Sequence, residues 1–490
     1  MRQALLPLLL AALSLSACQS PSTKAERPPN IILILADDLG YGELGSYGQS
    51  KIRTPHLDRL AAEGMRLRQH YSGSPVCAPS RCTLLTGLHT GHAFIRDNDE
   101  MGHRGDVWRD PALEGQRPLP PGTQTLGHAL QAAGYRTAAV GKWGLGWVGS
   151  SGEPSRQGFD LFFGYNCQRQ AHNYYPTHLW KNAEKVPLGN PVFFPHQKFP
   201  EEESAADPAA YQRYQGSDYA PDHMIEEALQ FIRENRDQPF FLYYPSPIPH
   251  LALQIPPSEL QAYLGEFEEE PYLGDKGYLP HPAPRAAYAA MISRLDAEVG
   301  RMLALLDQLE LENDTLVVFT SDNGPSWVGG VDREFFQSSG GLRGRKGQLF
   351  EGGIRVPCIV RWPGKVEAGS QSDHLSAFWD FFPTLAEVAG AETPKKLDGI
   401  SMLPTWLGNP ERQQQHEYLY WEYARRFQAM RMGNWKAYRP RPSADLQLYD
   451  LEADPNESHD LAAEHPERVE RFTQLMETAR SRSEHFPLKP

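Results

Sequence analysis

The sequence predicts an α/β fold whose central sheet is buried between helices, followed by a small α+β subdomain. Three apolar runs, at 31–35, 239–244 and 315–320, show no polar alternation, which is typical of strands covered on both faces. Helical patterns separate these runs, as they do in α/β proteins. Towards the C-terminus the pattern changes to short alternating strands and one charged helix. We therefore expect a catalytic domain at 29–405 and a C-terminal subdomain at 406–490.

The composition is that of a folded, acidic protein. The chain has 490 residues, of which 40% are hydrophobic and 22% are charged, and its net charge is −13. This length exceeds a single ordinary core, so we expect more than one domain. A nucleic-acid partner requires a basic surface, which the net charge argues against. An anionic substrate would require a locally basic site.

The N-terminal residues resemble an export signal with a lipid anchor. An apolar run at 4–15 is too short to cross a membrane and has the length of a signal-peptide core. It ends in Leu15-Ser16-Ala17-Cys18, which resembles a bacterial lipobox. We predict a signal peptide with lipidated Cys18 at 1–18 and a polar tether at 19–28. This implies a cell-envelope protein, periplasmic or surface-exposed, that contacts the membrane only through its lipid. The alternative is an ordinary secretory signal cleaved near Ala17.

Capping residues, prolines and glycines delimit the remaining elements. We predict helices from apolar residues at helical spacing at 54–64, 125–133, 222–235, 284–311 and 376–389. We predict further strands at 137–140 and up to residue 361, and C-terminal elements at 417–423, 429–432, 436–438, 447–450 and 466–482, the last a helix. The segment 146–216 is rich in aromatic residues, glycine, proline and histidine. We interpret it as an ordered excursion over the sheet that carries substrate specificity.

One segment places a nucleophile and a cation at the start of a helix. It reads Cys77-Ala78-Pro79-Ser80-Arg81-Cys82-Thr83-Leu84-Leu85-Thr86-Gly87, and its second half indicates a short helix ended by the glycine. The first cysteine would lie where free N–H groups favour a negative or strongly polar group. The arginine would lie one turn further on the same side, which suits a tetrahedral oxyanion substrate. The alternative is a buried structural cysteine.

Oxygen ligands follow two of the predicted buried strands. Asp37 and Asp38 come directly after the first, and Asp322 and Asn323 after the third. Open α/β sheets bind ligands beyond the carboxyl ends of their strands. Adjacent carboxylates repel each other unless a cation or donors lie nearby, and a hard divalent metal is the simplest cation. A capping aspartate turn is the alternative at the first strand, and the repeat at a second strand favours the metal.

Three further segments carry groups suited to an anionic substrate. Lys142 lies in a glycine-rich turn after a strand, where it could reach an oxyanion. His250 follows three closely spaced prolines at a strand end, a position suited to proton transfer. The loop 340–347 concentrates three cations, among them Lys346, which indicates an anion site in so acidic a chain. Each group has an alternative as a solvated turn or loop residue.

The motif Cys-x-Pro-Ser-Arg followed by Leu-Thr-Gly, between Cys77 and Gly87, resembles the signature of the formylglycine-dependent type I sulfatases. The resemblance continues in the family's order from Pro29 to the C-terminal subdomain. It implies an alkaline-phosphatase-like sandwich with a large mixed central sheet flanked by helices. It also implies a sulfuric ester hydrolase whose Cys77 a maturation enzyme oxidises to formylglycine. The expected substrates are O-sulfated saccharides from sulfated polysaccharides.

The resemblance also implies a metal and a role for each candidate residue. One Ca²⁺ per chain would be bound by Asp37, Asp38, Asp322, Asn323 and the formylglycine made from Cys77. Arg81 would steady the formylglycine, whereas Lys142 and Lys346 would hold the sulfate. His250 would face the leaving oxygen. We assign substrate binding to Lys346, His92 and Arg96.

One position departs from the family. Many members have a histidine two residues after the lysine, where this chain has Gly144. Either another base takes over, for which we consider His92, or the last elimination step is slower. The run Gly-Lys-Trp-Gly-Leu-Gly is typical of a branch of bacterial sulfatases that act on sulfated galactose-type sugars, which favours the first alternative.

Two other functions remain open at this level. A formylglycine-dependent phosphomonoester or phosphonate hydrolase would share the fold, but phosphate monoesters usually recruit a second metal or more cations. A lipid-anchored glycan-binding protein without catalysis would not need Cys77, Arg81, Lys142 and His250 together. The remaining cysteines, Cys82, Cys167 and Cys358, allow at most one disulfide.

Overall fold

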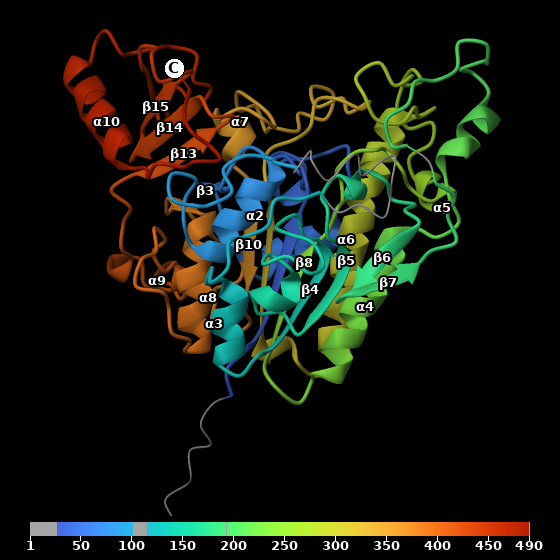
Figure 1. Ribbon diagram of the computed structural model, residues 1–490, viewed down its shortest axis with the longest axis horizontal. Coiled ribbons are helices and arrows are strands. Elements are labelled where there is room, and N and C mark those ends of the chain that lie inside the picture. The colour runs from blue at the N-terminus through green and yellow to red at the C-terminus, as the bar shows by residue number, and fades with distance from the viewer. Residues whose placement is uncertain (1–26, 101–114, 193, 490) are drawn as a thin grey trace, which may run out of the picture.

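The computed structural model describes residues 27–100, 115–192 and 194–489. A ten-stranded mixed sheet lies between two layers of helices, and a separate four-stranded sheet lies near the C-terminus (Figure 1). The predicted α/β class with a small C-terminal α+β unit is confirmed. The predicted signal peptide and Cys18 lie outside the described residues. Within those residues, no helix is both long enough and apolar enough to cross a membrane.

The strand order of the large sheet is β11-β2-β10-β9-β1-β8-β4-β5-β6-β7. Its strands are β1 (Asn30–Ala36), β2 (Met65–Leu67), β4 (Arg136–Lys142), β5 (Leu161–Tyr165), β6 (His178–Lys181), β7 (Glu184–Pro187), β8 (Phe240–Pro245), β9 (Thr315–Ser321), β10 (Cys358–Arg361) and β11 (Ser370–Ser372). The five strands from β9 to β5 are parallel, so their carboxyl ends meet at one edge. β10, β6 and β7 make antiparallel pairs.

Helices cover the sheet on both faces because β1 is apolar at every position of its run. Ile32 and Ile34 belong to the core under α1 (Pro55–Ala62), α4 (Ala220–Glu234) and α6 (Pro284–Gln308). Ile31 and Leu33 belong to the core under α2 (Cys77–Thr86), α3 (Leu126–Ala132) and α8 (Phe381–Ala389). Single-turn helices are α5 (Pro257–Leu260), α7 (Glu351–Ile354) and α9 (Leu403–Trp406). A short parallel pair joins β3 (His70–Tyr71) to β12 (Ser376–Ala377).

The C-terminal unit is an antiparallel sheet with one helix packed against it. Its strands are β13 (Leu419–Tyr423), β14 (Phe427–Met432), β15 (Trp435–Arg439) and β16 (Gln447–Asp450), and α10 (Pro466–Thr478) shares its apolar core. Figure 1 shows this unit at one end of the molecule, beside α7. Buried charges link it to the large domain, because the Lys436 ammonium lies 2.9 Å from carboxylate oxygens of both Glu351 and Glu457.

Two segments differ from their prediction. The excursion predicted at 146–216 contains β5, β6 and β7, which extend the large sheet at one end. The helix predicted to begin at 376 begins at Phe381, because the Asp380 carboxylate accepts the Ala377 N–H at 2.8 Å and holds a tight turn before it. Cys77, Cys82 and Cys358 are free, and all four described cysteines are buried.

Candidate active site

The site begins where β1 and β9 end side by side. Ala36 pairs with Ser321 in the parallel register, so the residues that follow these two strands emerge together. These are Asp37, Asp38, Asp322 and Asn323, and each is at most 1% exposed. The Asp322 Oδ1 atom accepts the Asp38 N–H at 3.1 Å, which ties the two strand ends to each other. The predicted carboxyl-end cluster therefore exists as one buried group of oxygens.

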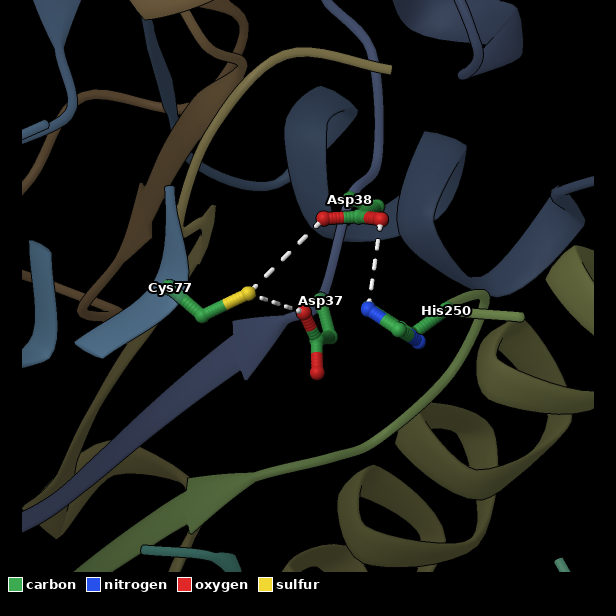
Figure 2. Close-up of side chains that lie close together, drawn as sticks. All are labelled: Asp37, Asp38, Cys77 and His250. Atoms are coloured by element: carbon green, nitrogen blue, oxygen red, sulfur yellow. Dashed lines mark hydrogen bonds and ion pairs between the residues drawn. The ribbon is translucent and has the colours of Figure 1, made fainter. Parts of the chain in front are cut away.

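Cys77 points into this cluster from the first residue of α2. Its Sγ atom lies 3.3 Å from Asp37 Oδ1 and 4.0 Å from Asp38 Oδ1 (Figure 2). Burial and the Asp37 carboxylate raise the pKa of the thiol well above its ordinary value. A thiol that stays protonated is a poor nucleophile, so we expect the unmodified cysteine to be unreactive here.

Three cations surround the same group. The Lys142 ammonium lies 2.5 Å from Asp37 Oδ2. The Lys346 ammonium lies 2.7 Å from Asp38 Oδ2 and 3.6 Å from the sulfur of Cys77. These contacts place positive charge close to the Cys77 sulfur, although the protein as a whole is acidic. An anionic substrate requires such a locally positive site.

Arg81 is the third cation, and it is held by two aspartates. Its Nη2 atom lies 2.8 Å from Asp322 Oδ2 and 3.4 Å from Asp37 Oδ2, and its Nη1 donates to the Lys142 carbonyl at 2.5 Å. Burial alone would raise the pKa of Asp37, but Lys142, His250 and Arg81 lower it well below its usual range. Burial and the charge of Asp37 raise the pKa of Asp322 above its usual range. The cluster is thus a network of coupled charges.

His250 faces the cluster from the loop after β8. Its Nε2 atom lies 3.7 Å from Asp38 Oδ2 (Figure 2), and its Nδ1 lies 2.6 Å from the Leu251 carbonyl oxygen. A carbonyl only accepts, so Nδ1 carries a hydrogen and the neutral ring leaves Nε2 free to take a proton. Burial and the Lys346 ammonium lower the pKa of His250 to about 4.

The chemistry of the donor set suits a hard cation. The Asn323 side-chain N–H₂ donates to Asp38 Oδ1 at 2.8 Å and to the Gly324 carbonyl at 2.9 Å. Its Oδ1 atom is buried and has no hydrogen-bond partner within the described residues. An orphaned amide oxygen beside three carboxylates is the oxygen-only arrangement that calcium and magnesium prefer. Asp37, Asp38, Asp322 and Asn323 can therefore hold such an ion.

Comparison with known proteins decides the family. The model of the family described as Sulfatase matches residues 29–391, and that described as N-sulphoglucosamine sulphohydrolase, C-terminal, matches residues 345–483.

This chain belongs to the sulfatase family.

Individual relatives agree with the family. The sulfatase is 33% identical to mouse steryl-sulfatase, over 89% of this chain and 76% of the relative. It is also 33% identical to rat N-acetylgalactosamine-6-sulfatase, over 83% of this chain and 70% of the relative. The crystal structure of Ps i-CgsB in complex with k-i-k-neocarrahexaose is similar with a TM-score of 0.72 and 27% identity, over 92% of each chain. The chain is therefore a sulfuric ester hydrolase.

Two predicted substrate-binding residues of the sulfatase have other partners. The Arg96 guanidinium is 4% exposed and lies 2.9 Å from Glu422 in β13 and 3.0 Å from the Ser481 carbonyl. These contacts join the large domain to the C-terminal unit. The His92 Nδ1–H group donates to Asp398 Oδ1 at 2.9 Å, and the His92 ring stacks on His89. The structure thus groups both residues with neighbours outside the Cys77 cluster.

The sulfatase also has site residues that the sequence reasoning missed. His172 stacks on His250 with ring centroids 4.6 Å apart, and His196 lies against Tyr278 at 4.4 Å. The signal was the histidine-rich and aromatic composition of the segment 146–216, which was interpreted as a specificity region without naming a residue. Gln168, from the same segment, lies beside Gly144.

Proposed function

We propose that this sulfatase hydrolyses O-sulfated saccharides with a formylglycine made from Cys77. One observation carries the proposal: the Cys77 sulfur is buried at the start of α2, 3.3 Å from Asp37 Oδ1 and 3.6 Å from the Lys346 ammonium. Formylglycine at this position would supply, as its hydrate, the oxygen that attacks sulfur. The cysteine side chain in the structure stands in for that hydrate, with Sγ at the place of an oxygen.

The metal is proposed to be one Ca²⁺ held by Asp37, Asp38, Asp322, Asn323 and the modified residue 77. Such an ion would supply Lewis-acid charge next to the nucleophile. In the structure the ammonium groups of Lys142 and Lys346 neutralise Asp37 and Asp38. An ion that supplied this charge would leave both ammonium groups for the oxygens of a sulfate.

The remaining steps belong to side chains of this chain. Arg81 is fixed by two carboxylates and the Lys142 carbonyl, so its guanidinium is already oriented for a tetrahedral anion. Lys142, which now pairs with Asp37, and Lys346, which now pairs with Asp38, would each bind an equatorial oxygen of the sulfate. His250 would donate a proton from Nε2 to the departing alcohol, since the negative charge of a bound sulfate raises the tendency of this nitrogen to be protonated.

The substrate class is proposed from two lines of support. One relative is named N-acetylgalactosamine-6-sulfatase, and one similar solved structure is a complex with k-i-k-neocarrahexaose. The Gly-Lys-Trp-Gly-Leu-Gly run around Gly144 is typical of sulfatases that act on galactose-type sugars. We therefore propose a sulfated saccharide of galactose configuration, and the family membership favours sulfate over phosphate esters and catalysis over simple glycan binding.

The direct test is mass spectrometry of the Cys77 peptide from protein made in a host that matures sulfatases. Conversion of cysteine to formylglycine lowers the peptide mass by about 18 Da, and the hydrate restores the mass of one water. Release of sulfate from an aryl sulfate and from sulfated galactose, measured on the same sample, should track the converted fraction. An unmodified thiol with full activity would refute the mechanism.

Lipid anchoring of the cell-envelope form is proposed from the lipobox ending at Cys18. A Cys18→Ala variant should lose incorporated fatty acid and move from the membrane fraction to the soluble fraction, with the same sulfatase activity per molecule. A variant that stays in the membrane fraction would contradict the anchor.

A further inference from the structure

Beside the active-site lysine, an arginine lies flat on an exposed tryptophan. The Arg345 Cζ atom is 3.7 Å from the centroid of the Trp327 ring. Trp327 is 44% exposed, and it is one of few large apolar side chains among the described residues with so much open surface. Stacking on a tryptophan face holds a guanidinium in place through cation–π attraction.

The Arg345 guanidinium keeps its donors. Within the part of the chain that the structure describes, no carboxylate pairs with the Arg345 guanidinium. The nearby cations Arg333 and Lys346 pair with Glu334 and Asp38. Stacking uses the π face of the guanidinium, so the in-plane N–H groups remain available to a ligand. Burial and the nearby Arg333 lower the pKa of Arg345, so both disfavour its positive charge. An anion bound beside Arg345 would offset this effect.

Arg343 in the loop and the nearby Arg333 already have other contacts. Arg343 donates to the Glu457 carbonyl and stacks on Phe350 at 3.8 Å. Arg333 pairs with Glu334 and donates to the Gly344 carbonyl at 3.2 Å. These contacts anchor the loop and leave Arg345 as its unpaired cation.

The loop that carries this arginine also brings Lys346 into the Cys77 cluster. The neighbouring Lys346 contacts Cys77 through its ammonium group at 3.6 Å. Its backbone N–H donates to the Pro325 carbonyl at 3.0 Å, and the Gln348 N–H donates to the Arg345 carbonyl at 3.0 Å. The segment with Trp327 and the segment with Arg345 are thereby tied together at the edge of the sulfate site.

We propose that Arg345 and Trp327 form a second anion subsite, which binds a further sulfate group of a polysulfated saccharide whose first sulfate lies at Cys77. This inference rests on the proposed function of the same site. The guanidinium edge would bind the second sulfate by a bidentate contact, and the exposed indole would pack against the sugar that carries it. The subsite would therefore select saccharides with more than one sulfate over those with a single one.

The test uses sucrose octasulfate as the probe, because it presents sulfate groups in every direction and does not require the natural sugar to be known. Binding is measured by calorimetry on the metal-loaded full chain in a Cys77→Ala background, which cannot turn the probe over. Arg345→Gln is compared with its parent, with Arg345→Lys and with Trp327→Ala. Arg412→Gln, which removes a surface arginine that is 79% exposed, is the matched control for net charge.

The expected result is a roughly tenfold weaker affinity for the probe in Arg345→Gln, which is the loss of one charge-assisted contact. Arg345→Lys should lie between this variant and the parent, Trp327→Ala should also weaken binding, and Arg412→Gln should not. In the wild-type background, the KM for para-nitrophenyl sulfate should stay the same in Arg345→Gln. Equal affinity in Arg345→Gln and parent, an equal loss in Arg412→Gln, or no binding by the parent would each overturn the subsite. Failure of the proposed function would appear separately, as absent hydrolysis of para-nitrophenyl sulfate by the wild type.

Discussion

Gln168 lies in van der Waals contact with the place that a Cβ atom on Gly144 would take. A Cβ atom added to Gly144 would lie 3.6 Å from both Cβ and Oε1 of Gln168 and 4.0 Å from Cδ of Arg81. Gln168 is 4% exposed, and its Oε1 atom has no hydrogen-bond partner in the described part of the chain. A buried acceptor without a partner beside Gly144 is suited to receive a hydrogen bond from a bound group.

The first prediction concerns this glutamine. Gln168→Ala should lower kcat for an aryl sulfate by about tenfold, the effect of one lost hydrogen bond, and leave KM nearly unchanged. An amide cannot serve as a base, so the effect would come from positioning rather than proton transfer. Steady-state kinetics measures both constants, with Gln131→Ala on the surface of α3 as the control. An unchanged kcat would show that Gln168 only fills space.

The second prediction concerns Lys346, whose ammonium group lies between Asp38 and Cys77. Lys346→Ala should lower kcat/KM by roughly 100-fold, because a preorganised cation beside the sulfate oxygens is lost. Lys346→Arg should recover part of this loss. The exposed Lys395→Ala should have no effect. Activity within a fewfold of wild type in Lys346→Ala would place the sulfate elsewhere in the cluster.

The third prediction concerns the orphaned oxygen of Asn323. A bound ion stabilises the folded state by mass action, so added Ca²⁺ should raise Tm of chelator-treated protein. Asn323→Ala should need a roughly 10–100-fold higher Ca²⁺ concentration for the same rise in Tm, a loss typical of disturbed metal sites. Thermal melts across a calcium titration measure this without reference to activity. An identical titration for the variant and wild type would remove Asn323 from the ligand set.

The fourth prediction separates two roles for Arg96. Arg96→Ala leaves the 2%-exposed Glu422 with Arg480 as its remaining cationic partner. Breaking a buried pair should lower the free energy of unfolding by about 3 kcal/mol, and KM should not change. Urea unfolding and aryl sulfatase kinetics on the same protein test both parts. A raised KM with unchanged stability would support the substrate-binding role predicted from the sequence.

Strand-end residues could be predicted from the sequence because local pattern determines them. Asp37, Asp38, Asp322 and Asn323 each follow an uninterrupted apolar run, and parallel strands bring such ends together. The partners of Arg96 and His92 could not be predicted from local sequence pattern. Their partners, Glu422 and Asp398, lie more than 300 residues away in the chain, so only the tertiary fold shows that Arg96 is used in a domain contact.

The specificity region was located by composition but not in detail. Its strands β6 and β7 are short, and the edge strand β7 reads Glu-Lys-Val-Pro, with no apolar alternation to reveal it. The position of Gln168 beside Gly144 depends on how β5 pairs with β4, which sequence periodicity does not determine. The stack of His172 on His250 likewise depends on a crossing of two loops.

The last prediction concerns stability rather than catalysis and rests on Glu298 in α6. Its carboxylate accepts from the Tyr244 hydroxyl at 2.9 Å and from Arg294 at 3.1 Å. Burial, only partly offset by Arg294, raises the pKa of Glu298 from its usual value near 4.5 to about 7. The folded state therefore holds this proton between these two values, whereas the unfolded state releases it. The stability contributed by the protonated group is fully present below about pH 4.5 and is lost as the pH rises through 7.

Glu298→Gln keeps the shape and the hydrogen-bond acceptor but does not titrate. The difference in stability, variant minus wild type, should therefore become more positive by an amount on the order of 3 kcal/mol between pH 4.5 and pH 8. Thermal or urea unfolding of both proteins at a series of pH values measures this difference and cancels the titration of all other groups. The exposed Glu411→Gln should show no such trend. A difference that is constant across the series would mean that Glu298 is ionised in the folded protein at every pH tested, with Arg294 as the dominant influence on its charge.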